Sequence, residues 1–343
     1  MNNRKGMIIT GLIVGVLSVL LVEFGNPANM GICVACFIRD ISGSLGLHRA
    51  AIVQYIRPEI IGFILGAFII SKISGEFKVT GGSSPVIRFV ISCFVMIGAL
   101  VFLGCPLRMV LRIAGGDLNA IVGLFGFIFG IIYGAQFLKK GFTLGRAYKQ
   151  NKTNGYVLPI VAMGLLSLII IKPAFIFLST KGPGALAAPI FIALGAGLIV
   201  GVLSQKSRLC MVGGIRDIYL IKDYNLFIGF ISILFSVFVL NLIFGNFNVS
   251  FIDQPAAHAD GLWNFLGMFL TGFGSMLLGG CPLRQTILAG QGNLDSVISF
   301  IGLLVGAAIA HNFLLVGTTL NGHIAVVVGI IVVSVIGYFN IEK

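Results

Sequence analysis

Two five-residue segments of this chain carry the same thiol and the same guanidinium. The sequence Gly-Cys-Pro-Leu-Arg occupies residues 104–108 and recurs at residues 280–284. Proline is well tolerated in the first turn of a helix, so each cysteine is predicted at or just before the start of a short helix. The free N–H groups at such a helix end attract anions, and a nearby arginine adds a full positive charge. The candidate binding residues are therefore Cys105, Arg108, Cys281 and Arg284.

A second cysteine motif is duplicated at nearly the same separation. Cys33 and Cys210 each precede an Ile-Arg-Asp triplet. Neighbouring arginine and aspartate can neutralise each other, so a structural ion pair is the stronger interpretation of each Arg-Asp step, and the two thiols are the better candidates for binding a ligand. The predicted ion pairs are Arg39 with Asp40 and Arg216 with Asp217.

Cys33 and Cys36 have the spacing of a redox pair, but the second copy has Gly213 where the first has Cys36. No thioredoxin-like βαβ pattern surrounds them, so redox chemistry is kept as an alternative only. The histidines and carboxylates do not cluster at metal-ligand spacing, and no nucleotide-binding motif is present. The sequence therefore predicts neither a metal nor a cofactor nor catalysis.

The composition indicates the environment in which these residues act. The 343 residues are 57% hydrophobic and 10% charged, and the mean hydropathy is +1.06. Soluble proteins carry about 25% charged residues. The prediction is an all-α polytopic membrane protein of about ten transmembrane helices. The net charge of +12 lies on no basic soluble domain, so it indicates membrane topology and an anionic substrate rather than nucleic acid.

Four short motif-bearing segments are too broken by glycine or proline to cross a bilayer. We expect them to be re-entrant or half-membrane segments, which are tolerated where they are buried in protein or line a cavity. They cover residues 25–48, 104–116, 206–221 and 280–292. The predicted spans are 7–24, 51–72, 86–103, 118–138, 157–178, 188–204, 224–245, 262–279, 294–316 and 322–340.

The duplication extends beyond the motifs, because the eight residues at 11–18 recur unchanged at 197–204. We expect one integral membrane domain made of two halves, 1–156 and 187–343, with 157–180 as a connecting span. Each repeat contains five spans if the motif segments turn back, and an odd number inverts the second half relative to the first. Motifs of inverted halves meet at the repeat interface, where transporters bind their substrates.

The distribution of charged residues among the loops predicts how the protein is oriented in the membrane. Residues 139–156 hold the densest basic run, whereas 246–261 hold two aspartates and no lysine or arginine. Because cytoplasmic loops are enriched in lysine and arginine, both termini are predicted to be cytoplasmic. Lys172 and Lys181, which fall on the outer side in this scheme, disagree with it.

At these motifs the chain resembles the YeeE/YedE sulfur-transport family, through Gly-Cys-Pro-Leu-Arg in both halves and cysteine followed by Arg-Asp. The first half is closest to the YedE branch, which is associated with selenium metabolism. The stretches that carry the branch resemblance are 26–40, 47–50, 57–63 and 115–120. The resemblance implies a multi-pass inner-membrane transporter that imports thiosulfate or a related sulfur or selenium anion.

The resemblance further implies that the substrate passes along cysteines of the re-entrant segments. In this chain that role falls on Cys105 and Cys281, with Cys33 and Cys210 as further stations. A thiosulfate-like anion is large and soft, so several weak thiol sites in series would permit its release. Three alternatives stay open: a permease specific for thiosulfate, a redox protein using Cys33 and Cys36, and a membrane subunit that serves a cytoplasmic sulfur or selenium carrier protein.

Overall fold

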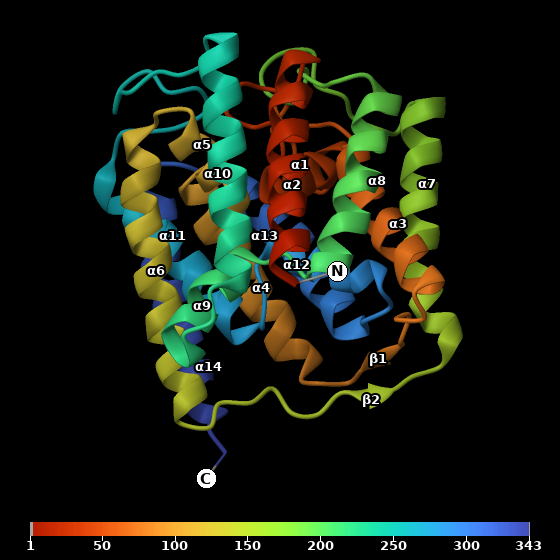
Figure 1. The fold of residues 1–343 in the computed structure, drawn as a ribbon, viewed down its shortest axis with the longest axis vertical. Helices are drawn as coiled ribbons and strands as arrows, with labels where there is room; N and C mark the ends of the chain where they lie inside the picture. Colours follow the sequence, from red (N-terminus) through yellow and green to blue (C-terminus); the bar gives the residue numbers. More distant parts are fainter. Residues whose placement is uncertain (1–2, 343) are drawn as a thin grey trace.

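The computed structural model describes residues 3–342, which fold almost entirely into helices (Figure 1). The predicted all-α polytopic fold is confirmed. The only sheet among these residues pairs two short strands in antiparallel register. The elements are α1 Asn3–Glu23, α2 Val34–Ser44, α3 Pro58–Ile73, β1 Thr80–Gly81, α4 Pro85–Val101, α5 Pro106–Ala114, α6 Leu118–Lys139, β2 Tyr148–Lys149, the 3-10 helix η1 Lys152–Tyr156, α7 Val157–Ile171, α8 Ile190–Ser207, α9 Met211–Ile221, α10 Asn225–Phe244, α11 Gly261–Leu277, α12 Pro282–Gly290, α13 Leu294–Asn312 and α14 Leu320–Phe339.

Nine of the described helices are long and apolar enough to cross a membrane. The predicted tenth span, 51–72, begins too early, because α3 starts at Pro58 and has 16 residues. Proline at the first helical position fixes this start, and the preceding loop is held by hydrogen bonds of its own, such as that from Gln54 Nε2 to the carbonyl of His48. The predicted span 157–178 ends too late, because α7 ends at Ile171. The other long helices follow the predicted spans to within a few residues.

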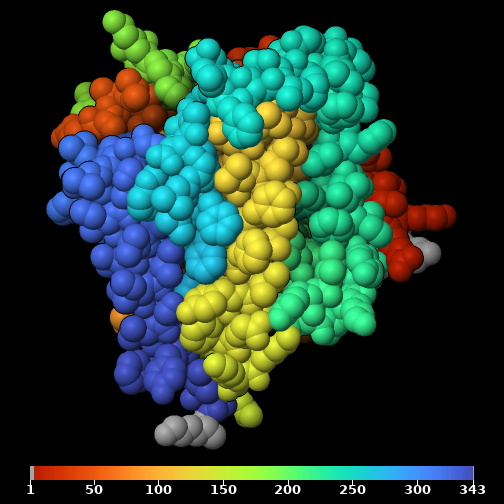
Figure 2. Space-filling model, turned by 90° about the vertical axis from the view of Figure 1, so that its left-hand side faces the viewer, coloured from red at the N-terminus to blue at the C-terminus, as the bar shows by residue number. Residues whose placement is uncertain are grey.

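Apolar side chains cover the outside of the helical bundle. Phe129 of α6, Phe191 of α8 and Phe235 of α10 are 54%, 81% and 60% exposed. Figure 2 shows one such face, where α6 lies between α11 and α10. Water would penalise this surface, whereas the hydrocarbon of a bilayer solvates it. The exposed faces therefore agree with a membrane location.

The long helices pack in pairs that join the two halves of the chain. Helix α1 lies against α10 and α3 against α8, while α4 lies against α13 and α6 against α11. Glycines permit this contact: a Cβ added at Gly126 of α6 would lie 2.0 Å from the carbonyl oxygen of Phe265 on α11. A Cβ at the aligned Gly302 of α13 would lie 2.6 Å from the carbonyl oxygen of Phe89 on α4. Small residues are what allow membrane helices to approach so closely.

Four short helices lie inside the bundle and carry the duplicated motifs. Helices α2 and α9 have 11 residues, and α5 and α12 have 9. At 1.5 Å per residue each spans roughly half of a hydrocarbon core of about 30 Å. In Figure 1, α2 and α5 lie in the upper half of the molecule, and α9 and α12 in the lower half. We call the lower side, which carries β1, β2 and the C-terminus, the β face.

Candidate functional site

Each of the four repeat-matched cysteines is the residue that immediately precedes a short helix. Cys33, Cys105, Cys210 and Cys281 are the N-caps of α2, α5, α9 and α12, and all four are at most 5% exposed. In α5 and α12 a proline occupies the first turn. The motif proline therefore starts the helix, and the thiol lies at its positive end.

In the first half, the two cysteine motifs come together. The Cys33 Sγ lies 2.7 Å from the Cys36 Sγ and accepts a hydrogen bond of 3.3 Å from the Cys36 N–H. The Cys105 thiol adjoins that of Cys33. We call Cys33, Cys36 and Cys105 the first thiol cluster. All three are buried and free of disulfide bonds.

In the second half, the matching motifs meet in the same way. The Cys210 and Cys281 sulfur atoms lie 3.9 Å apart, and Cys210 Sγ accepts a hydrogen bond from the Gly213 N–H. We call Cys210 and Cys281 the second thiol cluster. The sixth cysteine, Cys93, lies elsewhere, on α4 where Gly306 of α13 packs against it. Within residues 3–342, the thiols do not join histidine or carboxylate groups in an arrangement that would hold a metal ion.

Arg108 is fully buried beside the first thiol cluster. Its Nη1 lies 3.5 Å from Cys36 Sγ and also donates to the Leu103 carbonyl. Its Nε donates to the Asn29 carbonyl at 2.7 Å and its Nη2 to the Ala256 carbonyl at 3.0 Å. Among the described residues no carboxylate pairs with it. Backbone dipoles thus hold a positive charge at the cluster, and the side chain ties three separate segments together.

Arg284, the repeat counterpart of Arg108, has different surroundings. It is half-buried, and its only hydrogen bond within residues 3–342 is a weak one of 3.5 Å from Nη1 to Gln205 Oε1. It lines two cavities that open on the β-face side, and Cys210 lines the larger of these, of about 580 Å³. Most of its N–H groups are therefore available to a ligand, unlike those of Arg108.

The Arg-Asp steps form ion pairs in both halves. Arg39 and Asp40 meet at 2.7 Å and are buried, while Arg216 and Asp217 meet at 2.7 Å with side chains 31% and 15% exposed. Asp40 binds a second arginine, Arg57, at 2.7 Å, with both side chains fully buried. Among the described residues, neither group of ion pairs contacts the thiol clusters directly, although Arg216 and Asp217 line the cavity that Cys210 borders.

Two buried arginines were not predicted from the sequence as part of the site. Arg57 stands directly before Pro58, and Arg112 lies one helical turn after Arg108 and pairs with Asp117 at 2.6 Å. A charged residue in so apolar a chain is itself a signal, and it could have been used at both positions. Comparison of the two halves could not have singled out Arg112, because the second half has Leu288 at the matching position.

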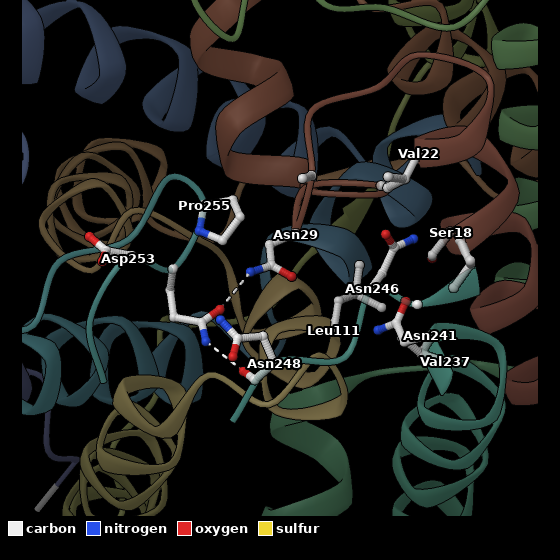
Figure 3. Close-up of a pocket in the computed structure, with 15 residues that line it drawn as sticks. Ser18, Val22, Asn29, Leu111, Val237, Asn241, Asn246, Asn248, Asp253 and Pro255 are labelled. Atoms are coloured by element: carbon white, nitrogen blue, oxygen red, sulfur yellow. Dashed lines mark hydrogen bonds between the residues drawn. The ribbon is translucent and has the colours of Figure 1, made fainter. Parts of the chain in front are cut away.

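The side opposite the β face has a smaller cavity of about 260 Å³, shown in Figure 3. Its wall is rich in amide side chains, including Asn29, Asn241 and Asn248, and no lysine or arginine within the described part of the chain lines it. Asn29 Nδ2 donates to Gln254 Oε1 at 3.3 Å, and Gln254 Nε2 donates to the Asn248 carbonyl at 2.7 Å. Asn29 connects this cavity to Arg108 through its backbone carbonyl.

Known proteins resemble parts of this chain. Residues 206–337, which include the second thiol cluster, match the family described as sulphur transport. Two relatives are each named thiosulfate transporter TsuA. The protein from Escherichia coli (strain K12) is 27% identical over 124 residues, which is 36% of this chain and 34% of the relative. The protein from Spirochaeta thermophila is 28% identical over 103 residues, 30% of this chain and 31% of the relative.

The family match and the two relatives support the resemblance of this chain to the YeeE/YedE sulfur-transport family. The aligned part spans about a third of the length of the curated relatives it matches. The match to a transport family and the bundle of apolar helices together support a multi-pass membrane protein. The family match lies within the second half, and the first half carries the matching copies of its cysteines and arginine.

Proposed function

We propose that this protein transports a sulfur-containing anion of the thiosulfate type through the membrane along its two thiol clusters. The observation that carries the proposal is the convergence of four repeat-matched cysteines into two buried clusters at helix starts. The second cluster borders a cavity through Cys210, and the first is linked through Arg108 to the wall of the opposite cavity. A path between the cavities would pass both clusters.

The chemistry of the clusters suits a soft, doubly charged anion. Thiols donate weak hydrogen bonds, so each cluster would hold the anion without trapping it, as conduction requires. The helix starts and Arg108 or Arg284 offset its charge. Because all the cysteines are buried, passage requires the short helices to separate, and the sites would open one after the other.

We also propose that the two halves are inverted repeats and that the β face is cytoplasmic. In Figure 1, α1 runs upward whereas its repeat counterpart α8 runs downward. The helix pairs agree with this symmetry, because α1 packs against α10 and its counterpart α8 packs against α3, the counterpart of α10. The basic loop 139–156 contains β2, so the rule for positive loops favours a cytoplasmic β face. In a bacterial cell this would be the inner membrane, with both termini inside.

The proposed substrate is thiosulfate, because the two relatives are named for it. A selenium compound stays a second candidate, supported by the resemblance of the first half to the YedE branch. Purified protein in liposomes tests both: labelled thiosulfate, selenite and selenosulfate are compared, with and without a proton gradient. Uptake by the purified protein alone, with no partner protein added, would exclude the alternative that it is only a subunit serving a cytoplasmic carrier. No uptake of any of the three would refute the proposal.

Cys36 distinguishes transport from redox chemistry. The second half has Gly213 at the matching position, so a relay through repeat-matched cysteines does not need this thiol. We expect Cys36→Gly to keep thiosulfate uptake within about twofold of the parent protein, since Arg108 retains its carbonyl acceptors. Uptake is measured in liposomes with matched protein content. Loss of uptake in this variant would favour the redox alternative.

A further inference from the structure

The smaller β-face cavity, of about 320 Å³, differs in charge from every other part of the proposed path. Lys78, Arg208 and Arg284 line it, and no carboxylate of residues 3–342 does. The remaining polar lining consists of neutral hydrogen-bonding groups, namely Thr80, Gln205, Gln291 and Asn293. Its walls come from α8, α12 and the loops beside β1 and α13, so segments distant in sequence bring the charges together.

Its cationic groups are free to bind a ligand. Among residues 3–342, the side chains of Arg208 and Lys78 have neither a hydrogen-bond nor an ion-pair partner, and Arg284 has one weak contact at 3.5 Å. The amide groups, by contrast, are fixed in place: Gln291 Nε2 donates to the Glu76 carbonyl at 3.0 Å. Three cations held close together repel one another, and an anion of matching charge would relieve that repulsion.

The adjoining larger cavity connects this wall to the second thiol cluster. Arg208 and Arg284 line both cavities, and Cys210 lines only the larger one. The carboxylates of the larger cavity are already engaged: Glu76 accepts from Gln205, Asp217 from Arg216, and Asp223 from the Asn225 N–H. Within residues 3–342, none of these three carboxylates forms an ion pair with Arg208 or Arg284, the two arginines that both cavities share.

The opposite cavity shows that this charge is specific to the β face. The two cavities occupy matching places in the two halves. Asp117 forms an isolated β-bridge with Ser250 near the opposite cavity, and the aligned Asn293 forms one with Thr80 at the β-face cavity. Among the described residues, the polar lining of the opposite cavity nonetheless consists mainly of amides with one aspartate, Asp253, and includes no cation. The duplication alone therefore does not explain the three cations.

We propose that Lys78, Arg208 and Arg284 form a binding site for a tetrahedral dianion, such as sulfate or thiosulfate, at the β-face mouth. Guanidinium groups bind such oxyanions through paired N–H donors, and the lysine adds a point charge. The site deepens the proposed function, since it would hold the substrate after the second thiol cluster. It would equally accept a dianion that arrives from the solution on the β face.

Arg208 offers a substitution that spares the fold. It ends α8 with φ 59°, in the left-handed region that glycine adopts without strain. Arg208→Gly should thus fold at least as well as the parent protein. Removing one charged donor weakens binding of an oxyanion by about tenfold or more. The matched control is Arg146→Gly, which removes an exposed arginine from the loop next to β2 and lines neither cavity.

The test is calorimetric titration of sulfate and of thiosulfate into the full-length protein in nanodiscs, with chloride at equal ionic strength as the reference. We expect both dianions to bind the parent protein and Arg146→Gly equally, and Arg208→Gly about tenfold more weakly. Three results would each overturn the site. They are equal dianion affinity in Arg208→Gly and the parent protein, no dianion binding to the parent protein, and chloride binding as strong as sulfate binding. Binding without any uptake in liposomes would refute the transport proposal alone, and uptake without this binding would refute the site alone.

A second experiment tests whether a dianion can reach the site from the solution on the β face. Liposomes with the β face inward are loaded with sulfate, and the initial rate of thiosulfate uptake is measured. If dianions in the inner solution occupy the site, loaded sulfate slows uptake by the parent protein and slows it less in Arg208→Gly. Equal slowing in both proteins would show that inner sulfate acts elsewhere, and would overturn access from that side.

Discussion

Replacing Cys281 or Cys105 with alanine is expected to reduce thiosulfate uptake to the rate of protein-free liposomes. Each thiol belongs to one of the two buried clusters, and Cys281 Sγ lies 3.9 Å from its cluster partner Cys210. A methyl group donates no hydrogen bond, so the anion would meet an apolar barrier at that station. The measurement is the initial rate of uptake of labelled thiosulfate into liposomes.

Loss of uptake must be separated from loss of fold. Removing one buried sulfur atom costs about 1 kcal/mol of stability, so both variants should remain folded and elute as the parent protein does in size-exclusion chromatography. Cys93→Ala is the matched control, because Cys93 is also buried but lies between α4 and α13, outside both clusters. Normal uptake by both Cys105→Ala and Cys281→Ala would contradict the relay.

Asp40→Asn is expected to destabilise the protein strongly. Asp40 is fully buried and is the ion-pair partner of both Arg39 and Arg57, each at 2.7 Å. The substitution leaves two buried guanidinium groups without a counter-charge, and breaking a buried pair from one side typically costs about 3–5 kcal/mol. The measurement is the midpoint of thermal unfolding in detergent, followed by circular dichroism.

The repeat supplies the control for this substitution. Asp217 is the counterpart of Asp40, but its pair with Arg216 is partly exposed and no second arginine joins it. Exposed ion pairs contribute about 1 kcal/mol or less, so Asp217→Asn should barely move the unfolding midpoint. Similar midpoints for the two variants would show that the buried charges around Asp40 do not stabilise the fold.

The sequence predicted the fold class because the bilayer imposes simple rules. A spanning helix needs about 20 apolar residues, and glycine or proline interrupts it visibly, so the long helices and the four short ones could be located in advance. The start of α3 could not, since an apolar run does not reveal that the loop before Pro58 folds back on itself. The inverted arrangement of the halves and the roles of the cysteines stay predictions.

By itself the sequence determined which residues recur: two cysteines and an arginine in each half, with an Arg-Asp step after the first cysteine. Only the tertiary structure decided which of them meet. It joins Cys33 with Cys105 and Cys210 with Cys281, buries Arg108 among carbonyl groups, and leaves Arg284 open to two cavities. The physical reason is that identical motifs meet different neighbours: the carbonyls of Pro255 and Ala256 reach Arg108, whereas near Arg284 the loop beside β1 supplies Lys78. A repeat fixes chemistry and spacing, but non-local contacts set the charge and solvent access of each copy.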